Sequence, residues 1–554
     1  MYSSEPLPHF VEHYLAYLRE IAPANAFFDG VHTHDDLLED FSRGAVEAHL
    51  RELGNFGRRL AAINPDSLTP VQQVERTIAE SHIRGRIHEL EHVRSWERNP
   101  QLYAEVIAAS LAGQVLFDYA PAAERARRIF SKLRQVPRLL QSARDNVKEP
   151  PGIFVKAAVE TLRGLRTFID RDLPRGLAAV DDLSILGDLA DASTEAEQAI
   201  AAYATYLETE LGPKAKGTFR LGRERFETKL KFEEGIDLSA AKLLEIGLRE
   251  MANVQEEFQA IARKAGGKEK KEPSDVWRAI KQNAHPKGSL ADIARSQVDE
   301  LQTFLKKHKL MTVPEGNGLS VAATPPFYRW TFASLWMPGP FEVRPHGAHF
   351  YLTEADSGWP AERQAEHQRD FCEPVLWSIS MHEAFPGHYL HFQRLRSVDS
   401  TLRKSLLFAP ASFVEGWAHY GEQLMFEQGF GKKEPGRRLG QLAEALVRLT
   451  RLVVGIRLHT EDLSVEQGVR MFREEAYLEE SSARREAERG TFDPQYVVYA
   501  LGRLMMLKLR ADAEEQQGAE FSLKTFHDRL LAQGLAPFWA QHELMLGRRA
   551  QSLI

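Results

Sequence analysis

One short segment carries most of the residue types that could perform chemistry. It reads SISMHEAFPGHYLH from 378 to 391 and brings His382, Glu383 and His388 close together. A neutral imidazole is a good zinc ligand, and a glutamate beside a ligand is well placed to take a proton from an attacking water molecule. The segment therefore predicts a metal site with two histidine ligands and a glutamate base.

The spacing of the two histidines requires a break in the helix that carries them. His382 and His388 are six residues apart, and six steps of about 100° leave them about 240° apart around an unbroken helix. Pro386 and Gly387 lie between them. Proline removes a backbone donor, and glycine permits unusual dihedral angles. We therefore expect the helix to break there and to return His388 to the metal.

A second segment supplies a candidate third ligand. It reads SFVEGWAHYGE from 412 to 422 and places Glu415, His419 and Glu422 on one stripe of a helix. Glu415 would complete a set of three ligands with an open fourth position, while His419 and Glu422 would orient the ligands. Alternatively, Ser412 and Glu415 form a capping box at the start of the helix. The apolar Trp417 and the acid–histidine–acid stripe favour the ligand role.

Two residues further along the chain are candidates for stabilising an oxyanion. Amide hydrolysis passes through a tetrahedral oxyanion, which requires a hydrogen-bond donor that faces the metal. His459 lies in the otherwise apolar run RLVVGIRLHTED. Tyr499 lies in a helix that we expect to start with Asp493 as its cap and Pro494 at its first position. Packing alone is the alternative role for His459 and Tyr499.

A small β element is expected in an otherwise helical chain. The stretch FEVRPHGAHFYLT predicts two short strands, 341–344 and 349–353, about a Pro-His-Gly turn. His346, His349 and Tyr351 would lie along a substrate groove, and an extended peptide could pair with the edge of this hairpin. Roles in the turn or on the surface are the alternative for the two histidines.

At these residues the chain resembles a known family. HEAFPGHYLH at 382–391, EGWAHYGE at 415–422 and YALGRLMMLKLR at 499–510 are similar to the motifs of the bacterial domain of unknown function 885 family, which comprises candidate metallopeptidases with zincin-like helical folds. The resemblance spans most of the second half of the chain. It implies a mostly α fold with a deep cleft and a zinc ion. The implied roles are metal ligand for His382, His388 and Glu415, general base for Glu383, and a position facing the site for His459 and Tyr499.

The departures from the family pattern lie around the expected cleft. Tyr389 and His391 replace the usual His and Gln after the second ligand, and Gly455 and Arg457 stand where Asp and Gly are expected before His459. Asp-Pro-Gln precedes Tyr499 in place of Pro-Gly-Gln. The ligand set is intact, so these departures bear on substrate choice rather than on the metal.

Apolar residues at helical spacing predict the architecture around the site. We expect a large, mostly α, two-lobed zincin-like fold with a deep central cleft and the small β element near the site. A helical N-terminal lobe would span 1–235, and a catalytic metal-binding helical lobe would span 236–554. The clearest helices are expected at 45–63, 70–92, 122–146, 194–210, 239–265 and 273–284, the last with Ser274 or Asp275 as its cap.

The whole chain excludes several classes of protein. Its 554 residues carry a formal net charge of -7, which does not suggest a nucleic acid partner. The single cysteine, Cys372, rules out an internal disulfide and a zinc site built from thiolates. We find no signal-peptide pattern and no apolar run of the roughly 18–20 residues that a membrane span requires. These features favour a cytoplasmic protein without a membrane partner.

The leading functional hypothesis is a zinc-dependent hydrolase, a metallopeptidase that cleaves short peptides or small amides. A deep cleft between helical lobes would exclude folded proteins. One alternative is a metal-dependent hydrolase or lyase that acts on a non-peptide small metabolite, since activated water serves either reaction. Another is a non-catalytic helical scaffold with a vestigial metal site, but a structural zinc needs no base such as Glu383. Manganese or cobalt could replace zinc.

Overall fold

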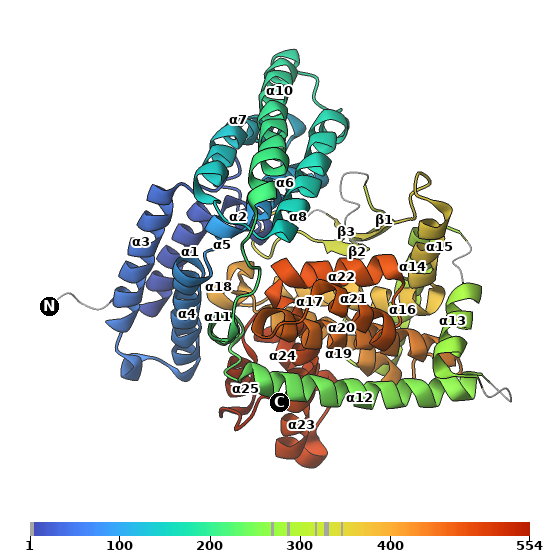
Figure 1. Cartoon of the computed structure of the whole chain (residues 1–554). Helices are drawn as coiled ribbons and strands as arrows, with labels where there is room; N and C mark the ends of the chain where they lie inside the picture. The colour runs from blue at the N-terminus through green and yellow to red at the C-terminus, as the bar shows by residue number, and fades with distance from the viewer. Residues whose placement is uncertain (1–4, 267–270, 285–287, 316–317, 326–331, 345–346) are drawn as a thin grey trace. The chain divides into compact units, whose positions relative to one another are not determined.

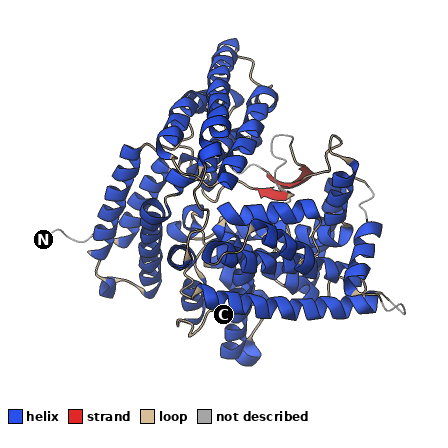
Figure 2. Ribbon diagram, in the orientation of Figure 1, coloured by secondary structure: helices blue, strands red, loops and turns tan. Residues whose placement is uncertain are grey.

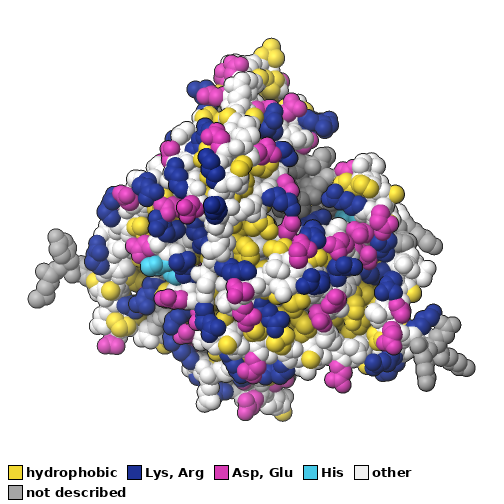
Figure 3. Space-filling view, viewed as in Figure 1, with side chains coloured by type: hydrophobic (Ala, Val, Ile, Leu, Met, Phe, Trp, Pro, Cys, Tyr) yellow, Lys and Arg dark blue, Asp and Glu magenta, His cyan; other side chains and the backbone are white. Residues whose placement is uncertain are grey.

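The computed structural model describes residues 5–266, 271–284, 288–315, 318–325, 332–344 and 347–554. Within these ranges the chain is almost entirely helical with one small sheet (Figure 2), which confirms the mostly α prediction. No helix in these ranges is long and apolar enough to cross a membrane. On the face shown in Figure 3, basic and acidic side chains are interspersed.

The chain divides into two compact units, and each is assembled from separate stretches of sequence. The first unit comprises Met1–Phe219, Pro338–His346 and Ser400–Phe408. The second comprises Arg220–Met337, Gly347–Asp399 and Ala409–Ile554. All the predicted metal ligands belong to the second unit.

The first unit is built from two groups of helices (Figure 1). In one group α6 contacts both α7 and α8, and α10 packs on α7 and α8. In the other, α1, α3 and α4 pack together. Because α6 has neighbours on several sides, its side chains are buried around most of its circumference, as Ile107 and Ala112 are. The helices of this unit are α1 (Leu7–Ile21), α2 (Pro23–Asp29), α3 (Arg43–Ala61), α4 (Pro70–His88), α5 (Ser95–Arg98), α6 (Pro100–Leu116), α7 (Ala122–Asn146), α8 (Gly152–Thr167), α9 (Leu173–Gly176), α10 (Leu183–Tyr206) and α18 (Thr401–Lys404).

The second unit is organised around α20 (Pro435–Thr460), which contacts α12, α16, α19, α22 and α23. A helix surrounded by others must be apolar on most sides, and Leu446 and Leu452, on different faces of α20, are fully buried. The remaining helices of this unit are α11 (Arg223–Lys229), α12 (Ala240–Ala265), α13 (Pro273–Asn283), α14 (Leu290–His308), α15 (Ala361–Asp370), α16 (Glu373–Glu383), α17 (His388–Leu395), α19 (Ala411–Glu427), α21 (Val465–Glu475), α22 (Glu480–Phe492), α23 (Val498–Gln517), α24 (Leu523–Ala532) and α25 (Phe538–Leu546).

The sheet of the second unit has three strands in the order β1-β3-β2. β3 (Ala348–Leu352) pairs in parallel with β1 (Leu319–Ala323) and antiparallel with β2 (Ala333–Trp336). β1 packs on α14, and β2 packs on α16. The β element therefore lies against the helix that carries His382, as the sequence predicted.

The predicted hairpin is nevertheless wrong in its first strand. Residues 341–344 form no strand and belong to the first unit. The Phe341 amide donates to the Asp29 carbonyl at 3.0 Å, and Glu342 bonds His32 at 2.7 Å across 310 positions of sequence. A local pattern cannot reveal such distant contacts. Because β3 is paired on both sides, it also offers no free edge for the predicted addition of a peptide.

The predicted helix ends are only partly correct. Helix α7 has the predicted bounds, and Ser239 caps α12 by accepting a hydrogen bond from the Lys242 amide. The predicted cap of α13 is wrong because Glu272 precedes the helix, and Ser274 and Asp275 lie in its first turn. Such local choices depend on one or two dihedral angles, so helix ends are harder to predict than helices.

Candidate metal centre

The two histidines are brought together by the predicted break in the helix. Helix α16 ends at Glu383 and α17 begins at His388, and the backbone of Gly387 between them has ψ of -136°. A Cβ atom at Gly387 would lie 1.7 Å from the His382 carbonyl oxygen, so only glycine fits there. The break leaves the two imidazole rings with centroids 4.7 Å apart and planes at 86°.

Glu415 reaches both rings from helix α19. Its Oε2 atom lies 3.2 Å from His382 Nε2 and 3.4 Å from His388 Nε2. The capping box that was the alternative for Glu415 does not form, because α19 begins at Ala411 without a side-chain cap. Instead the Ser412 amide donates to Glu234 Oε2 at 2.7 Å. The Glu415 carboxylate thus faces the histidines rather than the helix start.

The three groups fit a zinc ion by chemistry and by spacing. In a tetrahedral site with bonds of about 2.0–2.1 Å, neighbouring ligand atoms are about 3.3 Å apart. The two distances from Glu415 Oε2 match this value, and one ligand atom from each of His382, His388 and Glu415 lies within 4.8 Å of the other two. Two imidazoles and one carboxylate also form a donor set typical of catalytic zinc sites.

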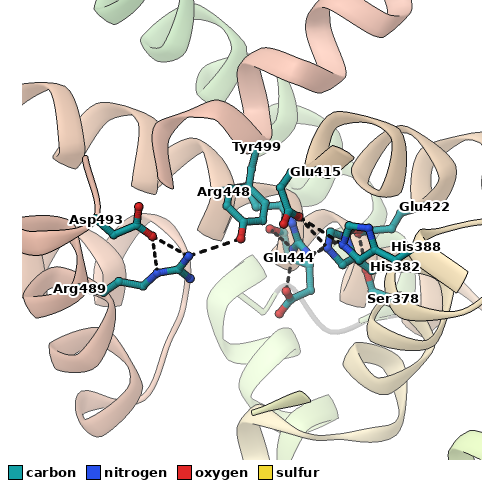
Figure 4. Close-up of polar contacts among 10 residues, drawn as sticks. All are labelled: Ser378, His382, His388, Glu415, Glu422, Glu444, Arg448, Arg489, Asp493 and Tyr499. Atoms are coloured by element: carbon teal, nitrogen blue, oxygen red, sulfur yellow. Dashed lines mark hydrogen bonds and ion pairs between the residues drawn. The ribbon is translucent and has the colours of Figure 1, made fainter. Parts of the chain in front are cut away.

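Behind the site, the buried carboxylate of Glu422 orients His382 (Figure 4). Glu422 Oε1 lies 2.8 Å from His382 Nδ1, and its Oε2 accepts a 2.6 Å hydrogen bond from Ser378 Oγ. Arg448 lies 3.2 Å from Glu422 and also bonds Glu444 at 2.7 Å. With the Nδ1 proton donated to Glu422, the Nε2 atom of His382 can serve as the metal ligand.

The charges of this network follow from burial and pairing. Burial acts to raise the pKa of Glu422, but Arg448 and the hydrogen bond from His382 lower it overall. Burial acts to lower the pKa of His382, but its bonds with Glu415 and Glu422 raise it to about 9. The pKa of Glu415 is well below its usual range because the two histidines outweigh its burial. A metal ion would therefore displace a proton from His382.

Tyr499 lies beside the ligands and is flanked by two arginines. Its ring centroid is 6.4 Å from that of His382, with the two planes at 16°. Arg489 Nη2 donates to the Tyr499 hydroxyl at 3.4 Å, and the Arg451 guanidinium lies 5.0 Å from the ring centroid. Burial, followed by the negative charge of Glu415, raises the pKa of Tyr499. The phenol is therefore neutral at ordinary pH and keeps a proton to donate.

The backbones of α19 and α23 touch at Gly416 and Gly502, which explains how Tyr499 comes close to Glu415. A Cβ atom at Gly502 would lie 2.0 Å from the Ser412 carbonyl oxygen, and one at Gly416 would lie 2.5 Å from the Gly502 carbonyl carbon. Any side chain at either position would force the two helices apart. Glu415 adjoins Gly416, and Tyr499 lies three residues before Gly502, so the glycines set the separation of these two side chains.

One known family model matches most of the length of this chain. A family model described as "Bacterial protein of unknown function (DUF885)" matches residues 23–540. The chain belongs to this family. No curated protein is significantly similar to it.

Two solved structures share the fold of this DUF885 chain. A candidate lipoprotein of unknown function from Shewanella oneidensis is 23% identical, with a TM-score of 0.81 over 98% of this chain and 100% of that one. A candidate lipoprotein from Colwellia psychrerythraea is 18% identical, with a TM-score of 0.81 over 97% of this chain and 98% of that one. At such identities the likeness concerns the fold alone.

Glu383 and His419 were also predicted for the site, and they differ in burial and in contacts. Glu383 is half-buried and ends α16 directly after His382. His419 is fully buried on α19, and burial, followed by Arg448 and Arg503, holds its pKa well below the usual range. Its ring makes no hydrogen bond with the three candidate ligands among the described residues. The orienting role predicted for His419 therefore stays a prediction.

His459 lies in α20, and its contacts with described residues involve α22 and α11. Its Nε2 atom bonds the Gly490 carbonyl at 2.8 Å, and its ring stacks on Phe226 with centroids 6.0 Å apart. These neighbours belong to α22 and α11, so the contacts of His459 are those of a packed residue. Its predicted role as an oxyanion donor stays a prediction.

The substrate residues predicted in the β element are described only in part. His346 lies outside the described residues. His349 and Tyr351 lie on the central strand β3 with their rings stacked 5.4 Å apart. His349 is half-buried and Tyr351 is buried, and burial raises the pKa of Tyr351 to about 12. Their role in substrate binding stays a prediction.

Sequence reasoning missed several residues of the network. Ser378 could have been found, because it lies four residues before His382 and therefore on the same helix face. Arg448, Glu444 and Arg489 carry no local signal, since charged residues at such spacings are common on solvated helices. Their importance appears only when α16, α19, α20 and α22 are packed together.

Proposed function

We propose that this protein is a zinc-dependent hydrolase, specifically a metallopeptidase that cleaves short peptides. One observation carries the proposal: His382 Nε2, His388 Nε2 and Glu415 Oε2 converge at 3.2 and 3.4 Å. The set consists of three protein ligands, which is the number found in catalytic rather than structural zinc sites. Glu383 follows His382 directly, where a base is useful for hydrolysis and unnecessary for a structural metal.

The roles of the side chains follow from their chemistry. A zinc ion bound there would polarise the substrate carbonyl and favour attack by water. Glu383 would take the proton of the attacking water and pass it to the leaving amine. Tyr499 would donate its phenolic proton in a hydrogen bond to the carbonyl oxygen as negative charge develops there. Glu422 would hold the His382 ring in its ligating orientation.

The size of the substrate and the location of the protein are proposed from the sequence. The restriction to short peptides follows from the cleft implied by the family resemblance. The predicted location also stays a prediction, since the two similar structures are described as candidate lipoproteins.

Metal analysis paired with peptide digestion tests the function. The purified protein should contain about one zinc per chain and should cleave members of a short-peptide library, with both properties lost in His388→Ala. A replacement of the exposed His92 by alanine provides a matched histidine control and should keep both properties. Zinc without cleavage of any peptide would refute the peptidase assignment and favour the small-metabolite hydrolase. Wild-type protein that binds no divalent metal would refute the metal centre itself.

A further inference from the structure

A row of partly exposed polar groups leads away from the three candidate ligands (Figure 4). The side chains of Glu415 and Arg489 are 22% and 34% exposed, and Tyr499, which lies between them, is also partly exposed. Arg489 Nη2 donates to the Tyr499 hydroxyl at 3.4 Å, and the Tyr499 ring faces that of His382. A substrate held at the ligands can therefore extend past Tyr499 to Arg489.

Arg489 differs from neighbouring Arg451 in how its donors are used. Arg451 forms a two-pronged pair with Glu486, with bonds of 2.7 and 2.8 Å to its two oxygens. By contrast, Nε and Nη2 of Arg489 both donate to a single oxygen of Asp493, at 3.0 and 2.8 Å. Its Nη1 makes no hydrogen bond within the described part of the chain. Because a guanidinium has five N–H donors in a planar fork, Arg489 can still bind a carboxylate.

Positive charge is in excess around this donor. Arg485 lies four residues before Arg489 on α22, which makes the two side chains neighbours. Its guanidinium stacks over the Phe332 ring at 4.4 Å and has no ion-pair partner among the described residues. The guanidiniums of Arg451, Arg485 and Arg489 all act on the carboxylate of Glu486, and Asp493 pairs with Arg489. Two further groups that act on Arg485, Arg363 and Asp370, have opposite charges and offset each other. One further anion would balance the cluster.

We propose that Arg489 binds the free C-terminal carboxylate of the peptide substrate, so that the protein acts as a carboxypeptidase. This inference rests on the proposed peptidase function and names its substrate class. In the reaction, water gives its OH to the acyl carbon and a proton to the leaving nitrogen, and the C–N bond breaks. The leaving group is the C-terminal fragment that Arg489 holds.

The contacts also limit the length of that fragment. Tyr499 is the proposed donor to the carbonyl oxygen, and Arg489 Nη2 lies 3.4 Å from the Tyr499 hydroxyl. The free donor Nη1 lies roughly 2.3 Å beyond Nη2 in the planar guanidinium. With a hydrogen bond of about 2.8 Å at each end, the carbonyl and carboxylate oxygens can lie at most about 11 Å apart. Because one residue spans at most about 3.6 Å, an extended fragment released by the enzyme should have no more than about three residues.

Binding to a non-cleaving variant tests the carboxylate site directly. Zinc-loaded Glu383→Gln protein is titrated by calorimetry with acetyl-tetra-alanine as the free acid and as the C-terminal amide. We expect the acid to bind about tenfold or more tightly, as charge-assisted hydrogen bonds require. Adding Arg489→Gln should abolish the difference. Adding Arg484→Gln should preserve it, because Arg484 lies on the same helix but pairs with Glu466 and Glu480.

Three outcomes would overturn the carboxylate site. These are equal binding of the acid and the amide, binding of neither peptide, and a preference that persists in Arg489→Gln. A lower unfolding temperature of Arg489→Gln together with a persistent preference would show that the arginine is only structural. Cleavage by the wild-type protein is measured separately. An acid preference in binding without any cleavage would refute the proposed peptidase function and leave the carboxylate site standing.

Discussion

Replacing Glu422 by glutamine tests whether the buried network supports the metal. The substitution keeps the size of the side chain but removes a fully buried negative charge that contacts His382, Ser378 and Arg448. Glutamine offers one acceptor oxygen where the carboxylate offers two, and its bond to the Nδ1 proton of His382 is weaker because it is not assisted by charge. Groups that orient a metal-bound histidine are worth about 10–100-fold in metal affinity, or about 1.4–2.7 kcal/mol.

The same substitution should also lower the stability of the metal-free protein. Removing one member of a buried ion pair costs about 3–5 kcal/mol when the other charge is left without compensation. Arg448 keeps its 2.7 Å bond with Glu444, so we expect a loss near or below the lower end of that range.

Glu444→Gln provides the matched control. Glu444 is also bonded to Arg448, but its side chain is 20% exposed and has no bond with His382 among the described residues. The Glu444→Gln substitution should lower the free energy of unfolding somewhat and leave the zinc affinity close to that of the unmodified protein. The assay is a competition titration with a fluorescent zinc chelator, accompanied by thermal unfolding in EDTA. Equal zinc affinity of the Glu422→Gln and Glu444→Gln proteins would refute the proposed role of Glu422.

Four further predictions concern the ligands, the base, the donor and pH. His388→Ala should remove the metal and leave the far-ultraviolet circular dichroism nearly unchanged, and full metal occupancy would contradict the ligand role. Glu383→Gln should keep the metal and lower turnover by about 10²–10⁴-fold, so near-normal peptide cleavage would exclude it as the base. Tyr499→Phe should lower turnover by about 10–10³-fold at unchanged metal content, whereas reduced stability with full turnover per folded molecule would make Tyr499 structural. In zinc-free protein the pKa of His382 is raised to about 9. The protonated ring therefore adds about 3 kcal/mol to the free energy of unfolding below about pH 6.5, and this contribution is lost as the pH rises through about 9. Unfolding temperatures of the wild-type and His382→Gln proteins in EDTA should therefore converge as pH approaches 9, and a difference that grows would contradict this sign.

The sequence alone determined those features that depend on neighbouring residues. Helical periodicity predicted a mostly α chain, and Pro386 and Gly387 predicted the break that returns His388 to His382. The meeting of these histidines with Glu415 was also predicted, and in the structure Glu415 Oε2 lies 3.2 and 3.4 Å from their Nε2 atoms, while their role as metal ligands stays a prediction. Such features are readable because backbone preferences and the geometry of a helix face are set within a few residues.

Only the tertiary structure decided which distant groups meet. The Arg448 partner of Glu422 and the Arg489 partner of Tyr499 come from other helices, and no spacing rule links them. For the same reason the strands that pair with β3 were not predicted, and residues 341–344 proved to contact Asp29 and His32 instead. His459 has the polar type required of a donor, but its contacts with Gly490 and Phe226 lie elsewhere. Residue type fixes what a side chain is able to do, whereas the packing of whole helices fixes what it touches.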